Sequence, residues 1–324
     1  MPYNSVTSRT DAAALIPEDA SRDILQDVVD NGWLFQSARR LQNMPSAQRR
    51  MPVLSLFPIA YFVDGDTGLK QTTEITWDNK YIDAEEVAVI VPISQAVLDD
   101  ADYDIWGEAK PLIANAFNKV ITQAVLYGTG IPASWTTNLG AAGIVAFATA
   151  APAVASAATF TDIYEAILGE SAVGSADGLI SMLEADGFLP NAHVAHTSVR
   201  TRLRNCRGTD GNPIFTRTPQ DVTSYGLDGE PCYFPRDGSI DSSEALIIAG
   251  DWTQLVYSMR QEMTYTISSE ATIHDAVGNP IWNLFQKDMV ALRCVMRLGF
   301  SLPNPINYME ETEADRSPFA ILTA

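Results

Sequence analysis

The feature that most constrains the fold is a pair of long apolar segments joined by a short polar turn. The first segment spans residues 53–63 and the second spans residues 75–91, with Asp64-Gly65-Asp66-Thr67-Gly68 between them. Such a pattern is typical of a β-hairpin with a glycine-containing tip. Each strand would be longer than the usual length of about five to six residues. Because no helical segment lies nearby in the sequence to cover the hairpin, we expect it to project from the body.

A projecting strand pair has an exposed backbone edge and exposed apolar side chains such as Phe57 and Trp77, a combination that monomeric proteins avoid. Residues 1–50 form a second dependent part. They predict one short helix, which starts near Pro17 and ends near Gly32, and they contain too few apolar residues for a core of their own. Parts that are not stable alone need neighbours, so the residues predict a subunit of an interlocking assembly.

The rest of the chain predicts an α+β fold. Apolar residues recur at helical spacing from Asp102 to Tyr127, and Pro111 should kink this long helix or mark a boundary in it. The alanine-rich stretch 141–160 contains Pro152 and is a poor membrane span, so we expect a surface connection there. Further patterns predict helices over 160–168, 175–185 and 198–206, the last capped by Ser198, and strands over 192–196, 246–249, 255–259, 263–268 and 282–298. Helices are therefore expected mainly before residue 207, and strands after residue 230.

The chain of 324 residues carries 21 basic and 40 acidic side chains, a net charge of −19. Proteins that grip phosphate backbones use clustered Lys and Arg, so this balance argues against a nucleic-acid reader. The pairs Arg39-Arg40 and Arg49-Arg50 are more simply solvated charges. Three widely spaced cysteines form no C-x-x-C motif, and the N-terminus does not resemble a signal peptide. A reducing cytosol fits these features best.

No catalytic or metal-binding constellation is apparent in the sequence. His193 and His196 lie three positions apart in an expected strand, which places them on opposite faces. Asp102 and Asp104 precede a helix, where a cap and a partner for the helix dipole are the simpler interpretation than a cation site. The Gly-x-Gly at residues 128–130 closes a helix, whereas a dinucleotide fingerprint opens one. We therefore expect no enzyme, no metal and no cofactor; a hydrolase built on a carboxylate pair is the alternative from another class.

Further motifs occur in a fixed order along nearly the whole chain. They are Leu15-Ile16-Pro17-Glu18, the run from Val91 to Asp100, Leu126-Tyr127-Gly128-Thr129-Gly130, His196 to Leu203 followed by Asp210-Gly211-Asn212-Pro213-Ile214-Phe215, Leu227-Asp228-Gly229-Glu230-Pro231-Cys232, Gly250-Asp251-Trp252, and Asp288 to Phe300. In this order they resemble the major capsid proteins of tailed bacteriophages with the Hong Kong 97 fold. The segment from Leu227 to Cys232 resembles the family's Leu-x-Gly-x-Pro-Val element but departs from it at the last position, where Cys232 replaces the valine.

The resemblance implies a division of the chain. Residues 1–50 would be the N-terminal arm, 51–93 the extended loop, 94–131 with 253–300 the peripheral domain with its spine helix, 132–252 the axial domain, and 301–324 a C-terminal segment. The implied function is structural: pentamers and hexamers would close into an icosahedral shell around packaged double-stranded DNA. Encapsulins, bacterial shells of similar fold that enclose enzymes, are the nearest alternative.

The resemblance also implies partners and a location. The chain's main partner would be itself, with a separate scaffolding protein or none, a portal, decoration or cement proteins, DNA enclosed without specific binding, and no membrane. The protein would belong to the virion and assemble in the cytoplasm of the bacterial host.

The expected contacts between subunits lie on the extended loop. The residues that we assign to them are Phe57, Asp64, Asp66, Lys70 and Trp77. Some relatives join a loop lysine to an asparagine of a neighbouring subunit with the help of a glutamate. The candidates for such a cross-link here are Lys70, Asn304 or Asn307, and Glu310. None of the last three falls in a segment that matches the family's cross-linking motif, so we expect shells held by non-covalent contacts or by a separate cementing protein.

Overall fold

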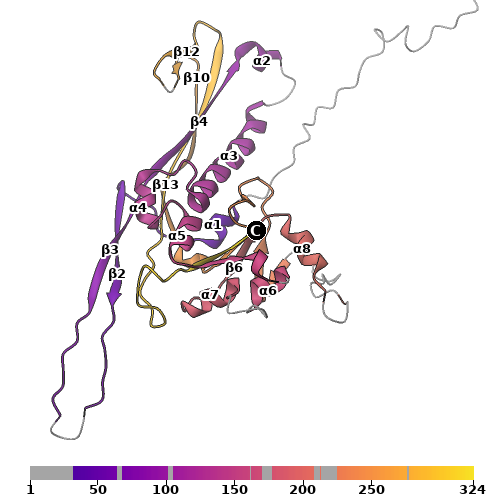
Figure 1. The fold of residues 1–324 in the computed structure, drawn as a ribbon. Helices are drawn as coiled ribbons and strands as arrows, with labels where there is room; N and C mark the ends of the chain where they lie inside the picture. Colours follow the sequence, from indigo (N-terminus) through magenta and orange to yellow (C-terminus); the bar gives the residue numbers. More distant parts are fainter. Residues whose placement is uncertain are drawn as a thin grey trace, which may run out of the picture.

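A long, slender four-stranded sheet forms one part of the protein. In the computed structural model, the described residues are 32–63, 68–100, 105–160, 162–169, 177–207, 212, 225–275 and 277–324. The sheet has the order β1-β10-β13-β4, in which only β1 and β10 run parallel. Its strands are β1 (Arg39–Arg40), β10 (Val256–Ser268), β13 (Met289–Ser301) and β4 (Glu85–Ser94). The long helix α3 (Ile105–Tyr127) runs beside this sheet (Figure 1).

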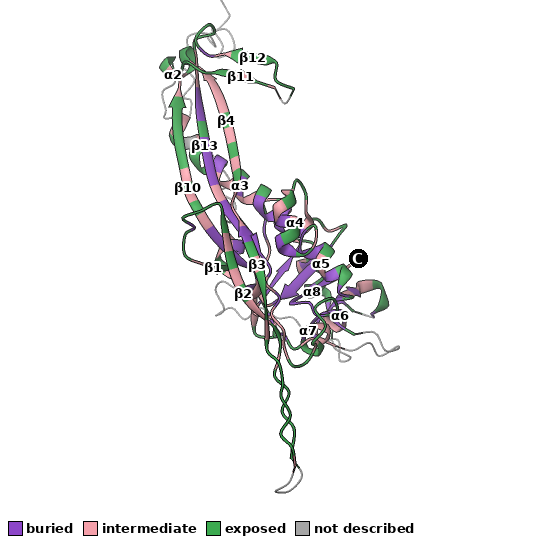
Figure 2. Ribbon diagram, turned by 90° about the vertical axis from the view of Figure 1, so that its left-hand side faces the viewer, coloured by how far each residue is buried: buried purple, intermediate pink, exposed green. Residues whose placement is uncertain are grey.

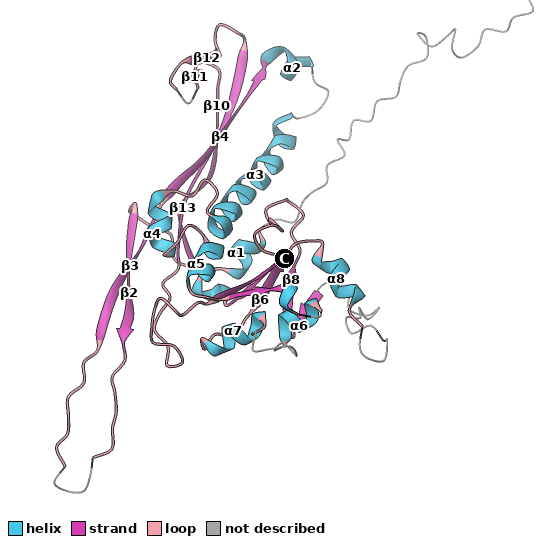
Figure 3. Ribbon diagram, viewed as in Figure 1, coloured by secondary structure: helices cyan, strands magenta, loops and turns pink. Residues whose placement is uncertain are grey.

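A second, six-stranded sheet forms the rest of the body, with the order β5-β14-β9-β6-β8-β7. Its strands are β5 (Val154–Ser156), β14 (Phe319–Thr323), β9 (Ile247–Gly250), β6 (Ala192–Ala195), β8 (Glu230–Tyr233) and β7 (Tyr225–Leu227). Helices surround it (Figure 3): α5 (Ile144–Ala150), α6 (Ile163–Leu168), α7 (Leu179–Ala185) and α8 (Val199–Asn205). Every residue of β6 and β9 is buried, as expected for central strands covered on both faces.

One hydrophobic core joins the two sheets. Residues of α3, of β13 and of the six-stranded sheet belong to the same buried cluster. Trp252 lies at its centre and contacts Trp33 and Phe319 edge to face, with ring centroids 5.1 and 5.0 Å apart. Its indole N–H donates to the carbonyl of Ala192 at 3.0 Å, so the ring is buried without an unpaired donor. The helix α1 (Trp33–Ser37) thereby ties the N-terminal part of the described chain to the body.

Two small strand pairs extend from opposite ends of the molecule (Figure 2). The strands β2 (Gln48–Leu56) and β3 (Thr76–Asp83) pair from Gln48 opposite Asp83 to Leu56 opposite Thr76. Beyond them the two chain segments continue as a thin, exposed ribbon. At the other end lie β11 (Thr272–His274), β12 (Pro280–Asn283) and α2 (Gln95–Asp100). The remaining elements are α4 (Ala133–Leu139) and two short 3-10 helices, Ala157–Thr159 and Trp252–Gln254.

The expectation of one continuous strand over 75–91 is wrong. The strand β3 ends at Asp83, and β4 begins at Glu85 and pairs with β13 instead of β2. Ile82 is buried beside Val256 of β10, so the chain is fixed against the sheet before it turns. The extended pair therefore joins the sheet at Ala84, and residue 93, the boundary that the resemblance implied, lies inside β4.

The alanine-rich stretch 141–160 is also different from the expectation. It forms α5 and β5 and belongs to the core, with Ile144, Ala148 and Ala155 buried. Small side chains allow close approach here, because a Cβ on Gly143 would lie 2.6 Å from the backbone nitrogen of Gly128. A low content of large apolar residues thus reflects tight packing between α3, α5 and β14 and not a position on the surface.

Other expectations are confirmed or refined. The fold class is α+β, and the long helix continues through Pro111 as α3; residues 101–104 and the expected helix near Pro17 lie outside the described residues. Segments 255–259 and 263–268 form the single strand β10, while 282–298 divides into β12 and β13. Ser198 precedes α8 but does not cap it with its side chain; its hydroxyl lies 2.9 Å from Nδ1 of His196.

The buried face of α3 provides a test of the core. Phe117 is 3% exposed and Leu112 on the same helix is 51% exposed. We expect Phe117→Asp to destabilise the protein by several kcal/mol, because it buries an unpaired charge. Leu112→Asp should change the free energy of unfolding by less than about 1 kcal/mol. Urea denaturation followed by circular dichroism measures both, and a stable, soluble Phe117→Asp variant would show that this face is assigned wrongly.

Candidate functional site

The exposed ribbon beyond β2 and β3 is the candidate functional site. Large apolar side chains are exposed along it and on the strands that lead to it: Leu56, Ile59, Tyr61, Phe62, Val63, Leu69, Ile75, Trp77 and Tyr81. Phe62 and Leu69 make almost no contact with the rest of the chain, at 105% and 90% exposure. A contiguous apolar surface of this kind marks an interaction site.

Few interactions within the ribbon hold its two segments together. The strand ladder ends at Leu56 opposite Thr76. Farther out, the amide of Ile59 donates to the hydroxyl of Thr73 at 3.0 Å, and the hydroxyl of Tyr61 donates to the carbonyl of Gln71. An isolated two-stranded ribbon is marginally stable in water. The ribbon therefore needs a covering surface to be ordered as a rigid element.

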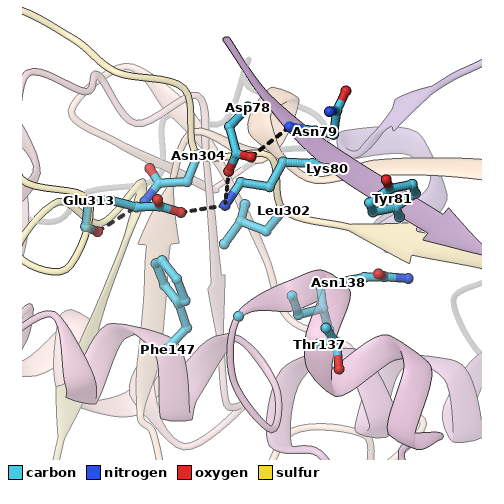
Figure 4. A pocket seen from close by; sticks show the side chains of 12 residues that line it. Asp78, Asn79, Lys80, Tyr81, Thr137, Asn138, Phe147, Leu302, Asn304 and Glu313 are labelled. Carbon is cyan, nitrogen blue, oxygen red and sulfur yellow. Dashed lines mark hydrogen bonds and ion pairs between the residues drawn. The ribbon is translucent and has the colours of Figure 1, made fainter. Parts of the chain in front are cut away.

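The base of the ribbon, in contrast, is anchored to the C-terminal part of the chain. The ring of Phe57 stacks on that of Tyr308, with centroids 4.0 Å apart and planes at 9°. Nζ of Lys80 lies 2.6 Å from Oε1 of Glu313 and 3.9 Å from a carboxylate oxygen of Asp78 (Figure 4). These contacts fix the direction in which the ribbon leaves the body.

A single buried arginine shapes the segment that anchors the ribbon. The Arg316 guanidinium donates to the carbonyls of Asn304 and Glu310, each at 2.9 Å, and to that of Glu311 at 3.2 Å. Its Nε also donates to the side-chain oxygen of Asn304 at 3.3 Å. Burial lowers the pKa of Arg316, while the nearby carboxylates, Glu313 foremost, raise it. The arginine thus closes residues 304–316 into a loop that presents Tyr308 and Glu313 to the ribbon.

A cavity of about 210 Å³ lies where β3, α4 and this loop meet (Figure 4). Side chains that line it include Lys80, Asn138, Phe147, Asn304 and Glu313. Within the described ranges, no group of three His, Cys, Asp or Glu residues could hold a metal ion. Lys80 and Glu313 are paired with each other. We therefore interpret the cavity as the place where β3, α4 and the loop join.

The predicted contact residues have different environments. Trp77 and Lys70 are exposed on the ribbon, whereas Phe57 is half-buried against Tyr308 of its own chain. Asp64 and Asp66 lie outside the described residues. Contact between subunits at these positions stays a prediction.

The candidate cross-linking residues have local partners. Asn304 is buried, and its Nδ2 donates to the Arg316 carbonyl at 3.1 Å. Nδ2 of Asn307 donates to the carbonyl of Asp186 at 2.7 Å. Hydrogen bonds from Thr312 lower the pKa of Glu310, the wrong direction for a base that must take a proton from an amine. Whether these residues form a cross-link stays a prediction.

Sequence reasoning missed Tyr308, Arg316 and the pairing of Lys80 with Glu313. A signal was present, since the acidic run Glu310–Asp315 is followed directly by Arg316. The expected strand 192–196 is one residue shorter, because β6 ends at Ala195: His193 is fully buried in it, and His196 follows it, partly exposed beside Ser198. Burial lowers the pKa of His193 to about 4, so this side chain is neutral near pH 7.

No helix in the described part of the chain has both the length and the apolar character to span a membrane.

The structure contains a projecting strand pair and a long helix, as the capsid resemblance implied for the extended loop and the spine helix. The model of the phage capsid family matches residues 12–308. The chain belongs to the phage capsid family. A curated relative, the major capsid protein of Staphylococcus phage 80alpha, is 26% identical over 296 residues, which cover 90% of this chain and 83% of the relative.

Solved structures extend the likeness to the whole fold. A chain from Microbacterium phage Oxtober96 is 29% identical, with a TM-score of 0.83 and coverage of 98% of this chain and 99% of that one. A chain from Mycobacterium phage Adephagia is 27% identical, with a TM-score of 0.79 and 98% coverage of both. The capsid of a native GTA particle shares the fold alone, at 16% identity, a TM-score of 0.67 and coverage of 99% and 100%. These matches confirm the Hong Kong 97 fold and a structural role in a capsid shell, and they do not favour an encapsulin.

The Arg316 cluster generates a stability prediction. We expect Arg316→Met to lower the free energy of unfolding by about 3 kcal/mol or more, because it leaves buried carbonyl groups unpaired. Arg297→Met is the matched control, since Arg297 pairs with Glu86 on the surface and such pairs contribute less than about 1 kcal/mol. Equal losses in urea denaturation would contradict the structural role of Arg316.

Cross-linking has a direct test. Mature particles that are boiled and reduced should give a single band near the chain mass of 35.2 kDa on a denaturing gel. A ladder of larger bands that disappears in Lys70→Ala particles would overturn the expectation of non-covalent contacts.

Proposed function

We propose that this chain is the major, self-assembling subunit of an icosahedral shell, arranged in pentamers and hexamers around packaged double-stranded DNA. The observation that carries the proposal is the exposed apolar ribbon. It is anchored at its base by Phe57 and Lys80, yet none of the described parts of its own chain covers its outer part. In a closed shell, each ribbon would lie on a neighbouring copy, which would bury Phe62, Leu69 and Trp77.

The division of the chain supports the same arrangement. We assign the four-stranded sheet and α3 to a peripheral domain, and the six-stranded sheet with α5 to α8 to an axial domain. The strand β14 pairs with β9, so the last residues of the chain complete the axial sheet. Residues 1–50 would be the arm, whose part before Trp33 would lie against other copies.

The net charge of −19 supports a container that does not grip its contents. Phosphate backbones are repelled by an acidic surface, so DNA would be enclosed without sequence-specific contacts. The other expected partners are a portal, decoration or cement proteins, and a separate scaffolding protein or none. Assembly would take place in the bacterial cytoplasm.

Changes on the ribbon test the proposal. The double variant Phe62→Asp with Leu69→Asp, or deletion of residues 64–68, should yield folded subunits or capsomers but few closed particles, since the apolar contact with a neighbour is lost. Phe62→Tyr with Leu69→Met keeps the apolar surface and should assemble. Sedimentation and negative-stain electron microscopy measure closure. Normal yields of closed particles from both disruptive changes would contradict the proposal, and shells that contain enzymes instead of DNA would favour an encapsulin.

A further inference from the structure

Helix α8 concentrates positive charge in an otherwise acidic chain. Four of the 21 basic residues, Arg200, Arg202, Arg204 and Arg207, fall within eight positions at this helix. Arg202, Arg204 and Arg207 are exposed. None of these three forms an ion pair within the described ranges. We refer to these three side chains as the arginine surface.

The fold holds this surface in a fixed orientation. Val199 and Leu203 of α8 are fully buried in the core, which sets the face that α8 presents outward. The guanidinium of Arg200 lies over the ring of Phe234, 5.5 Å from its centroid. Nε of Arg204 donates to the carbonyl of Arg200 at 3.1 Å, which leaves the other N–H groups of Arg204 available to an acidic partner.

An acidic loop lies on the opposite flank of the same chain. Residues 310–315 carry four carboxylates, of which those of Glu311, Glu313 and Asp315 are exposed. Glu313 pairs with Lys80 at the base of the ribbon. In Figure 1, α8 lies on the right of the six-stranded sheet, and the loop lies on its left, near the ribbon's base. The two charged features are therefore too far apart to neutralise each other within one chain.

We propose that the arginine surface of α8 is a contact between copies and receives the acidic loop of a neighbouring copy. The inference rests on the proposed shell function. Contacts between two different flanks of identical subunits repeat head to tail and close into rings. Copies with a net charge of −19 repel one another, so a contact that pairs Arg202 and Arg204 with Glu311 and Asp315 would offset repulsion where subunits meet. Because such exposed pairs are weak and screened by salt, they would set orientation and assembly rate more than total stability.

DNA is the competing partner for exposed arginines. The observations favour a second copy, because the acidic loop offers complementary charge and the chain's net charge of −19 repels phosphate. The two partners differ in the expected phenotype: loss of a copy contact impairs closure, while loss of a DNA contact leaves closed shells with altered contents.

A charge-swap experiment in the full chain tests the proposal. Arg202→Glu with Arg204→Glu reverses the arginine surface, and Glu311→Lys with Asp315→Lys reverses the loop while leaving Glu313 on Lys80. Each double variant should lower the yield of closed particles by about tenfold at low ionic strength. The quadruple variant should return to within about twofold of the wild type, because the pairing is restored with opposite signs.

The controls separate folding, contact and shell function. Arg202→Lys with Arg204→Lys keeps the charge and should assemble, and the thermal midpoints of all subunits should match, since the changed side chains are exposed. The proposed α8 contact would be overturned if the variant with a reversed arginine surface forms closed particles at the normal yield, or if the quadruple variant does not regain the wild-type yield. Closed wild-type particles prepared in parallel would show that the proposed shell function itself still holds. Closed α8-reversal shells that lack DNA would also overturn the α8 contact and identify nucleic acid as the partner. Failure of the wild type to form particles would instead refute the shell function.

Discussion

The corner at Asp83 and Ala84 is the constraint on which the rest of the structure depends. Here the chain leaves β3, which leads to the projecting ribbon, and enters β4 of the four-stranded sheet. It passes β13 so closely that a Cβ on Gly299 would lie 2.4 Å from the Asp83 carbonyl oxygen. The indole N–H of Trp135 donates to that carbonyl at 3.1 Å, and Asn138 donates to the Asp83 carboxylate at 3.0 Å. A Cβ at position 299 would clash with this backbone, so a glycine far away in the sequence permits the close turn from β3 into β4.

This corner separates two kinds of stability. On the body side, α3, β13 and the six-stranded sheet share one core around Trp252. On the ribbon side, order depends on the stack of Phe57 on Tyr308, the ion pair of Lys80 with Glu313, and a surface that another copy would provide. A capsid subunit benefits from this division, because the body has a core of its own while the contacts of the ribbon would become favourable only between copies.

The charge of the protein also has two separate aspects, the net charge of the whole chain and the charge of local clusters. A net charge of −19 means that copies of the chain repel one another, yet they must still meet in a shell. Local clusters differ in burial: Arg316 is buried and organises the acidic loop from inside, whereas the arginine surface of α8 is exposed on the other flank. The net charge thus acts between whole subunits, whereas the charges of local clusters act over the short distances at which side chains meet.

The sequence alone determined the α+β class, the long helix ending at Tyr127, the projecting strand pair and the capsid resemblance, because these follow from local periodicity, turn composition and the order of short motifs. It did not reveal that residues 75–91 form two strands in different sheets, that the alanine-rich stretch 141–160 is core, or that Arg316 builds the base of the ribbon. Those features depend on close approaches between separate segments, such as Gly299 to Asp83 and Gly143 to Gly128, and on side-chain hydrogen bonds such as those of Arg316 to Asn304. Only the tertiary structure decided them, since burial and close approach are properties of neighbours in space and leave no periodic signal in the chain.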